Sequence, residues 1–166
     1  MTKDSDFLEM IEKGFPEEPI PTHFFWSLCE SALDRDIPEE LSSRIAHRSW
    51  KHITILDWRK IGASPAIARV FIEPSTFLYY LPSLLTGVFH NIEYIDFALE
   101  SILPYNKMHL PRGKWWDEFS QTVSPAQRAA FFAFLWRVRV TLWDKIGLAD
   151  QSLVQDAERI WSDGHE

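Results

Sequence analysis

Apolar residues recur every three or four positions through most of the chain, which is the spacing that buries one face of an α-helix. Phe7 and Ile11 begin the pattern, and Gly14 follows as a residue suited to end a helix. Later segments repeat the spacing and are separated by proline-rich or polar connectors. We predict helices over 4–13, 23–36, 38–47, 76–88, 92–103, 125–146 and 151–162.

Helix 125–146 has the clearest start of these. Ser124 and Gln127 form a capping box, in which each side chain accepts the other's backbone N–H, and Pro125 suits the first helical position. A helix that is apolar over a wide arc is expected to lie at the centre of its domain. Two apolar series cover this helix: Phe131, Leu135, Val138 and Leu142, and Phe132, Trp136, Val140 and Trp143.

Pro82 lies inside helix 76–88 and interrupts its hydrogen bonding. Proline has no N–H to donate to the carbonyl of Leu78, and its ring crowds that turn, so we expect a kink or a restart there. The freed carbonyl needs another donor. A tyrosine hydroxyl or a tryptophan indole from elsewhere in the fold would supply it.

Two segments show no clear helical period. Residues 48–72 contain tryptophans and isoleucines at mixed spacings, and 66–72 is compatible with a short strand or an extended segment. Residues 104–123 are expected to form a long loop of the kind that is often functional. No linker divides the chain, so we predict one mostly α domain over 1–166, an irregular bundle of six to seven helices.

The composition is that of a globular chain with many rings. Its 166 residues include 12 Phe, 8 Trp and 4 Tyr, which favours a ring-packed core with some Trp left for a partner surface. A single cysteine, Cys29, excludes an internal disulfide. The start of the chain does not resemble a signal peptide, and no apolar run could span a membrane, so we expect a cytoplasmic protein without membrane contact.

Charge is unevenly distributed along the chain. The net charge is −7, and the acidic segment 1–40 carries −8 whereas 41–72 carries +5. An acidic chain with charge blocks of alternating sign lacks the concentrated basic face that nucleic acid requires. We therefore expect a protein partner of basic character and no nucleic-acid binding.

No catalytic or cofactor motif is present. The chain lacks phosphate-binding glycine loops, nucleophile elbows and paired metal-binding histidines, and its six histidines are scattered. We predict no metal, no cofactor and no catalytic residue, while a site assembled from distant residues stays open because catalytic groups are recognised by geometry rather than order.

Three groups of residues are candidates for binding, and each also has a structural interpretation. A polar stripe on helix 76–88 either faces a ligand or faces solvent, and an acidic series on helix 92–103 either binds a partner or is solvated. Rings that follow the sequence LPRGK either anchor a partner or cover the core. The groups are Tyr79, Ser83, Thr86 and His90; Glu93, Asp96 and Glu100; and Trp115, Trp116 and Phe119.

Residues 50–142 resemble a family of small bacterial proteins without an assigned activity. The resemblance is carried by the sequence FIEPSTFLYYLP, in which Phe71, Pro74, Phe77, Tyr79 and Tyr80 to Pro82 match, and by Ser124 to Arg128. It implies kinship and no particular reaction. The acidic segment 1–40 lies outside the matching region.

The leading hypothesis is a cytoplasmic protein-binding module, more finely an immunity-type inhibitor of a basic toxin or effector. Its expected contacts are Asp34, Asp36, Glu93, Asp96 and Glu100, with Trp115 and Trp116 as apolar anchors. One alternative is a small enzyme whose pocket at the Pro82 kink uses the polar stripe. Another is an oligomeric scaffold, for example a homodimer that buries exposed Trp against a second copy.

Overall fold

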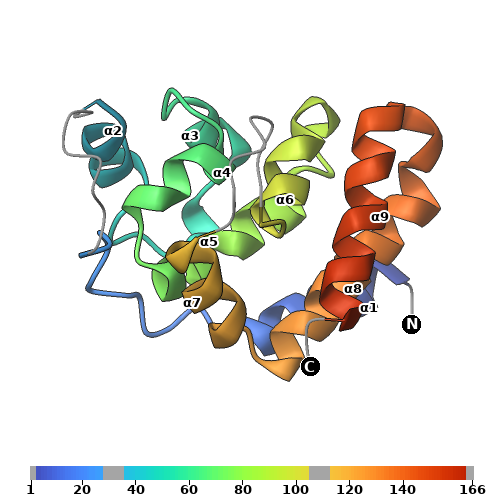
Figure 1. Cartoon of the computed structure of the whole chain (residues 1–166), viewed down its shortest axis with the longest axis horizontal. Coiled ribbons are helices and arrows are strands. Elements are labelled where there is room, and N and C mark those ends of the chain that lie inside the picture. The colour runs from blue at the N-terminus through green and yellow to red at the C-terminus, as the bar shows by residue number, and fades with distance from the viewer. Residues whose placement is uncertain (1–2, 28–35, 105–112, 164–166) are drawn as a thin grey trace.

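The protein is described as a computed structural model that covers residues 3–27, 36–104 and 113–163. Within these ranges the fold is helical, as expected, with nine α-helices rather than six to seven (Figure 1). Four short 3-10 turns join them. The helices are α1 Lys3–Gly14, α2 Asp36–Arg44, α3 Ile55–Arg59, α4 Pro65–Ala68, α5 Pro74–Gly87, α6 Ile95–Ser101, α7 Lys114–Thr122, α8 Pro125–Thr141 and α9 Leu148–Asp163.

The predicted helix 23–36 is wrong in its first part, and its remainder lies outside the described residues. Residues 23–27 are not helical. Phe25 forms an isolated antiparallel bridge with Ile72, and the backbone N–H of Trp26 donates to the Phe71 carbonyl at 2.8 Å. Pairing with a distant segment therefore replaces the local helical hydrogen bonds that the sequence pattern suggested.

Two other predictions need correction. The strand considered for 66–72 is absent apart from the bridge at Ile72, because 65–71 form α4 and a 3-10 turn. The loop predicted for 104–123 contains α7 from Lys114, and residues 105–112 lie outside the described ranges. Trp115 and Phe119, one helical turn apart, are both buried on α7.

Helix α5 lies at the centre of the molecule, and α3, α6 and α7 pack against it (Figure 1). It continues through Pro82, so the predicted restart does not occur. A tryptophan indole does lie beside Pro82, but it belongs to Trp58 and donates to the Ser83 hydroxyl at 2.9 Å rather than to the Leu78 carbonyl. The Ser83 hydroxyl donates in turn to the carbonyl of Tyr80 at 2.6 Å.

The core is a continuous cluster of rings and aliphatic side chains around α5. Phe77 on α5 contacts the rings of Trp58, Trp115 and Phe119 at centroid distances of 5.5 to 6.1 Å. Trp161 on α9 extends the cluster to Phe131 on α8 at 4.9 Å. The ring-packed core predicted from the composition is therefore present.

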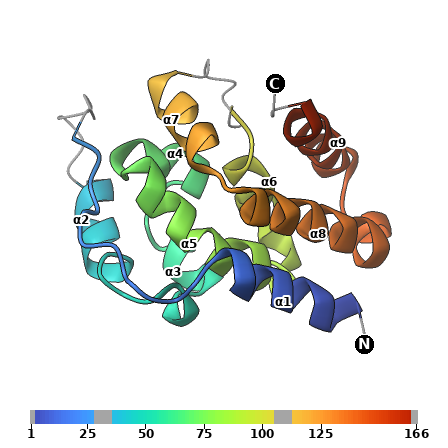
Figure 2. The same ribbon diagram turned by 90° about the horizontal axis from the view of Figure 1, so that it is seen from below.

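Helices α1, α8 and α9 form the side of the molecule opposite α2 (Figure 2). Helix α1 lies alongside α8 although more than 100 residues separate them in the sequence, and α9 packs against α6 and α8. A paired contact joins α8 to α9, in which Arg139 donates to both carboxylate oxygens of Glu158 at 2.6 and 2.7 Å.

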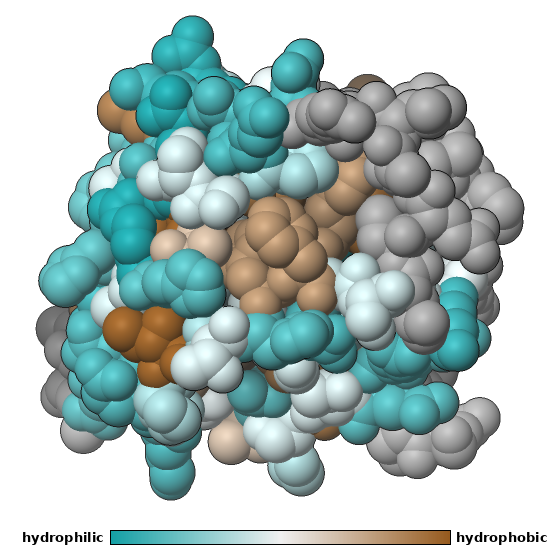
Figure 3. Space-filling model, turned by 90° about the vertical axis from the view of Figure 1, so that its left-hand side faces the viewer, coloured by the Kyte–Doolittle hydropathy of each residue, from teal (hydrophilic) through white to brown (hydrophobic). Residues whose placement is uncertain are grey.

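The face shown in Figure 3 is mostly hydrophilic, with a group of hydrophobic atoms near its centre. Among the exposed apolar residues, Leu56 on α3 is 48% exposed. None of the helices in the described ranges combines the length and apolar character needed to cross a bilayer.

Candidate functional site

The two apolar series of α8 have different surroundings. Phe131, Leu135 and Val138 are buried in the core, as predicted. In the second series Trp136 is 54% exposed and Val140 50% exposed, whereas Phe132 and Trp143 are half-buried against the core. The expectation that α8 lies at the centre of the domain is therefore wrong, because its second apolar face is only partly covered.

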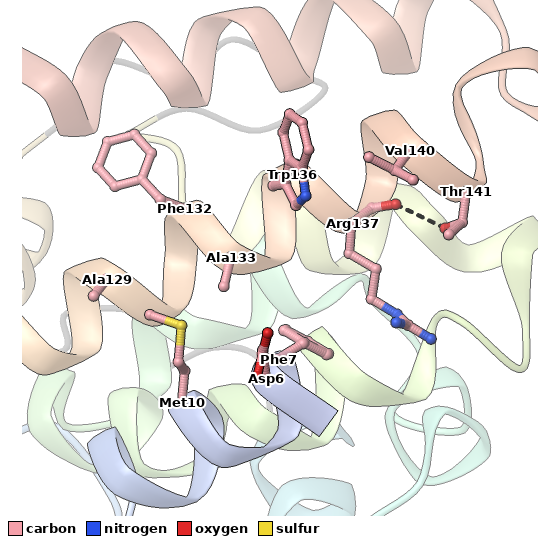
Figure 4. A pocket seen from close by; sticks show the side chains of 10 residues that line it. All are labelled: Asp6, Phe7, Met10, Ala129, Phe132, Ala133, Trp136, Arg137, Val140 and Thr141. Carbon is pink, nitrogen blue, oxygen red and sulfur yellow. Dashed lines mark hydrogen bonds between the residues drawn. The ribbon is translucent and has the colours of Figure 1, made fainter. Parts of the chain in front are cut away.

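The second series forms one side of a groove between α1 and α8 with a volume of about 620 Å³ (Figure 4). Most of its lining atoms belong to apolar side chains. The lining residues are Asp6, Phe7 and Met10 from α1, and Ala129, Phe132, Ala133, Trp136, Arg137, Val140 and Thr141 from the α8 side.

Side-chain size gives the groove its shape. Ala129 and Ala133 lie one turn apart on α8, and their short side chains leave the space between Met10 on α1 and Phe132 and Trp136 on α8 (Figure 4). A helix with larger residues at these two positions would fill the groove from within. The alanines therefore form its floor and the rings its outer wall.

Close approach at one end fixes α1 against α8. A Cβ added to Gly14 would lie 3.2 Å from the carbonyl oxygen of Ala126, which is tighter than ordinary packing. Toward the other end of α1, the Arg137 guanidinium lies 5.6 Å from the centroid of the Phe7 ring. Since Gly14 meets Ala126 and Phe7 meets Arg137, the two helices run antiparallel.

The start of α8 is fixed by the predicted capping box. The Gln127 N–H donates to the Ser124 hydroxyl at 3.1 Å, and the Ser124 N–H donates to the Gln127 side-chain oxygen at 2.9 Å. This cap sets which residues begin the first turn, and hence which face of α8 carries Phe132 and Trp136. The capping prediction is confirmed.

The groove carries charge at one end only. The carboxylate of Asp6 projects from α1 toward α8, and Arg137 lies nearby with its guanidinium 4.8 Å from the centroid of the Phe89 ring (Figure 4). Asp6 is exposed. Among the residues whose side chains the structure describes, which begin at Asp6 itself, Asp6 has no hydrogen-bond or ion-pair partner. The opposite end, at Met10 and Ala129, is apolar.

The acidic residues expected to bind a partner do not form one surface. Asp34 lies outside the described residues. Asp36 begins α2 and is exposed, and Glu93 is exposed in the turn before α6. Asp96 is half-buried, whereas Glu100 is only 2% exposed, so the expected acidic face of helix 92–103 is wrong at Glu100. Glu100 is directed inward, where it acts electrostatically on the buried Arg69.

Trp115 and Trp116 are core residues and not surface anchors. They are 7% and 4% exposed, and the Trp115 indole donates to the Ile72 carbonyl at 2.8 Å. The guanidinium of Arg69 lies over both rings. Their expected role as apolar anchors therefore needs correction, because both rings are already occupied within the fold.

The polar stripe of α5 does not converge on one pocket. Tyr79 donates to the Glu17 carbonyl at 2.7 Å, and Ser83 is buried beside Trp58. Thr86 borders a shallow cleft next to α1, and His90 is exposed. The four side chains therefore have different surroundings: Tyr79 holds a connecting segment, Ser83 lies in the core, Thr86 borders a cleft and His90 is exposed.

Metal-binding side chains do not gather in the part of the chain that the structure describes, where no three His, Cys, Asp or Glu residues could share an ion. No family model matches the chain, and neither a curated protein nor a solved structure matches it. The geometry of the groove between α1 and α8 is therefore the basis for inferring its function.

Sequence reasoning missed the groove although one signal for it was present. The series Phe132, Trp136 and Val140 was recognised as apolar and was assigned to the core. Asp6 and Met10 carried no signal of their own, because their position next to α8 depends on packing across the chain.

Proposed function

We propose that the protein is a protein-binding module that holds an amphipathic helix of a partner in the groove between α1 and α8. The exposure of Trp136 carries this proposal. Five of the eight tryptophans are buried and two are half-buried, whereas Trp136 is 54% exposed beside an apolar groove. Partly exposed Trp in a concave apolar surface is typical of residues that dominate binding.

The dimensions of the groove favour a helix as its occupant. Ala129 to Thr141 span about 18 Å at roughly 1.5 Å per residue, which equals about three helical turns. The lining positions of α8 recur at helical spacing along this length. A partner helix with apolar residues at i, i+3 or i+4 and i+7 would match them, as in helix-in-groove recognition.

Covering Trp136 would contribute substantially to affinity. With 54% of Trp136 exposed, a partner would cover roughly 130 Å² of it, which corresponds to about 3 kcal/mol at about 25 cal/mol per Å². Every 1.4 kcal/mol is about tenfold in affinity. We therefore expect removal of the Trp136 ring to weaken binding by at least tenfold.

The experiment is a selection from a display library of helix-stabilised peptides about four turns long, roughly 14 residues at 3.6 per turn. Selected peptides are then titrated against wild type and Trp136→Ala by fluorescence polarisation. Leu56→Ala is the matched control, because Leu56 is a comparably exposed apolar residue on α3. Peptides whose affinity falls at least tenfold for Trp136→Ala and does not change for Leu56→Ala support the proposal.

Two results would overturn it. One is a library that yields no peptide whose affinity depends on Trp136. The other is a dimer seen by sedimentation that Trp136→Ala dissociates, because the groove would then be covered by a second copy of the chain. The net charge of −7 argues against that arrangement, since two acidic copies repel.

We propose, more finely, that the partner is a basic toxin or effector and that the protein acts as its inhibitor in the cytoplasm. The acidic net charge supports this, because opposite charge accelerates association and favours a basic partner. The test is co-expression with the product of an adjacent gene, with host growth as the measurement. Rescue of growth by wild type and its loss with Trp136→Ala is the expected result, and equal rescue by both chains would refute the role of the groove.

A further inference from the structure

The charge at one end of the groove indicates which charge the bound helix carries. Asp6 projects into the groove beside Phe7, and no hydrogen-bond or ion-pair partner for it occurs among the side chains that the structure describes, those of 6–27, 36–104 and 113–162. An apolar helix lying over Ala133 would reduce the solvation of this carboxylate. Burying an ionised carboxylate is costly unless a cation meets it.

We infer that the bound helix carries a lysine or arginine that pairs with Asp6, placed at one end of its apolar series. The inference rests on the proposed function, because it concerns the partner of the same groove. It adds the sign and the position of a charge, and it excludes a purely apolar helix as the preferred ligand.

The position follows from the antiparallel packing of α1 and α8. Asp6 lies near the N-terminal end of α1, which is the end next to Arg137, Val140 and Thr141. Met10, one turn further along α1, faces Ala129 and Ala133, where the lining is apolar (Figure 4). The partner's cation therefore binds at the Val140 end, and its apolar anchors bind between Met10 and Trp136.

Arg137 shapes this preference without cancelling it. Its guanidinium is directed onto the rings of Phe7 and Phe89, at 5.6 and 4.8 Å from their centroids. This arrangement holds the positive charge of Arg137 against the two rings. The Asp6 carboxylate therefore presents the negative charge that an incoming helix meets.

Parallel selections test the inference. The same helical peptide library is selected against wild type and against Asp6→Lys, and the selected peptides are sequenced and titrated. We expect lysine or arginine to be enriched at one end of the apolar series with wild type, and glutamate or aspartate at the same position with Asp6→Lys. Wild-type-selected peptides should weaken about threefold on Asp6→Asn and about tenfold on Asp6→Lys, as for a charge pair at the edge of an interface.

Two controls separate a local contact from a general charge effect. Glu39→Lys changes the net charge by the same amount on α2, on the opposite side of the molecule, and should leave the affinity unchanged. Raising the salt concentration should weaken wild-type binding more than binding to Asp6→Asn, because salt screens exposed charges. Far-UV circular dichroism checks that each variant folds, and Asp6→Asn keeps the test decisive if Asp6→Lys does not fold.

The outcomes distinguish the two proposals. Peptides that depend on Trp136 but show no charge preference, and that bind Asp6→Lys as well as wild type, overturn the inference about the cation and leave the groove as a binding site. Peptides that respond equally to Asp6→Lys and Glu39→Lys also overturn it. A library without any peptide that depends on Trp136 overturns the proposed function itself.

Discussion

Replacing Arg69 by methionine tests the buried polar contacts that join α6 to the first half of the chain. Arg69 is 5% exposed, directly after α4. Its guanidinium donates to the carbonyls of Glu100 and Ser101 at 3.2 and 3.1 Å, and to that of Leu103 at 2.8 Å. It also lies 4.9 Å from the centroid of the Trp115 ring. One side chain therefore closes the C-terminal end of α6 and covers α7.

The magnitude follows from what the substitution leaves behind. Burial lowers the pKa of Arg69 to about 10, and the carboxylate of Glu100 opposes that shift. Arg69 therefore stays protonated at neutral pH. Methionine would remove the donor from the buried carbonyls of Glu100, Ser101 and Leu103, and the loss of hydrogen bonds to buried acceptors costs about 1–3 kcal/mol. We expect the free energy of unfolding to fall by that amount, out of a total of roughly 5–15 kcal/mol for a domain.

The assay is urea denaturation at neutral pH, followed by far-UV circular dichroism for wild type, Arg69→Met, Glu100→Gln and the double variant. The double variant should lose at least about 0.5 kcal/mol less than the sum of the single changes, because the electrostatic interaction of Glu100 with Arg69 is lost in each single variant but only once in the double variant. Lys114→Met is the control, since Lys114 is exposed at the start of α7. A loss below about 1 kcal/mol for Arg69→Met, or strictly additive single changes, would refute the reasoning.

Three further predictions concern single residues. Burial raises the pKa of Tyr80 from 10.0 to about 12. The protonated phenol therefore stabilises the folded state, fully below pH 10.0, and this stabilisation is lost as the pH rises through about 12. Urea midpoints in an alkaline pH series should therefore fall more steeply for wild type than for Tyr80→Phe, and equal slopes would contradict this. Ser124→Ala should lower the free energy of unfolding by about 1 kcal/mol through loss of the α8 cap, whereas Ser42→Ala at an exposed position should not change it. Gly87→Ala would place a Cβ 2.7 Å from Cγ1 of Ile55, so we expect a loss of about 1–3 kcal/mol from overpacking. Thermal unfolding measures it, and an equally large loss from Gly87→Ala in an Ile55→Ala background, which lacks Cγ1 and Cδ1, would argue against the steric cause.

Local signals in the sequence predicted the helices that those signals fully determine. The capping box at Ser124 and Gln127 placed the start of α8 correctly, and the spacing of Phe7 and Ile11 placed α1. In both cases the residues that make the element lie within it. Periodicity and capping suffice when no distant segment competes for the backbone.

Predictions failed where a distant contact decides the local structure. Phe25 was assigned to a helix, but its backbone pairs with Ile72, which lies 47 positions further along the numbering. Trp115 and Trp116 were considered as surface anchors because the rings follow a proline-containing segment, yet Arg69 lies over both. The residues next to Phe25, and those next to Trp115 and Trp116, give no indication of these contacts.

The candidate site shows a different limit, because its residues were seen and their surroundings were not. Two apolar faces on one helix predict a central helix, and α8 has enough neighbours to cover only the first of them fully. The sequence pattern shows which positions of a helix are apolar, but it does not show how many neighbouring helices are available to cover them. A partly covered second face is therefore visible only after the packing of α1 and α9 is known.

Under the proposed function, the exposed surface of Trp136 is the surface that a partner helix would cover. The residue is 54% exposed, so a large part of its apolar surface stays accessible to a ligand. Phe132 and Val140 extend the same partly covered face along the groove, and Ala129 and Ala133 keep its floor low. A stability requirement would favour larger residues at the two alanines, whereas an incoming helix requires the space that they leave open.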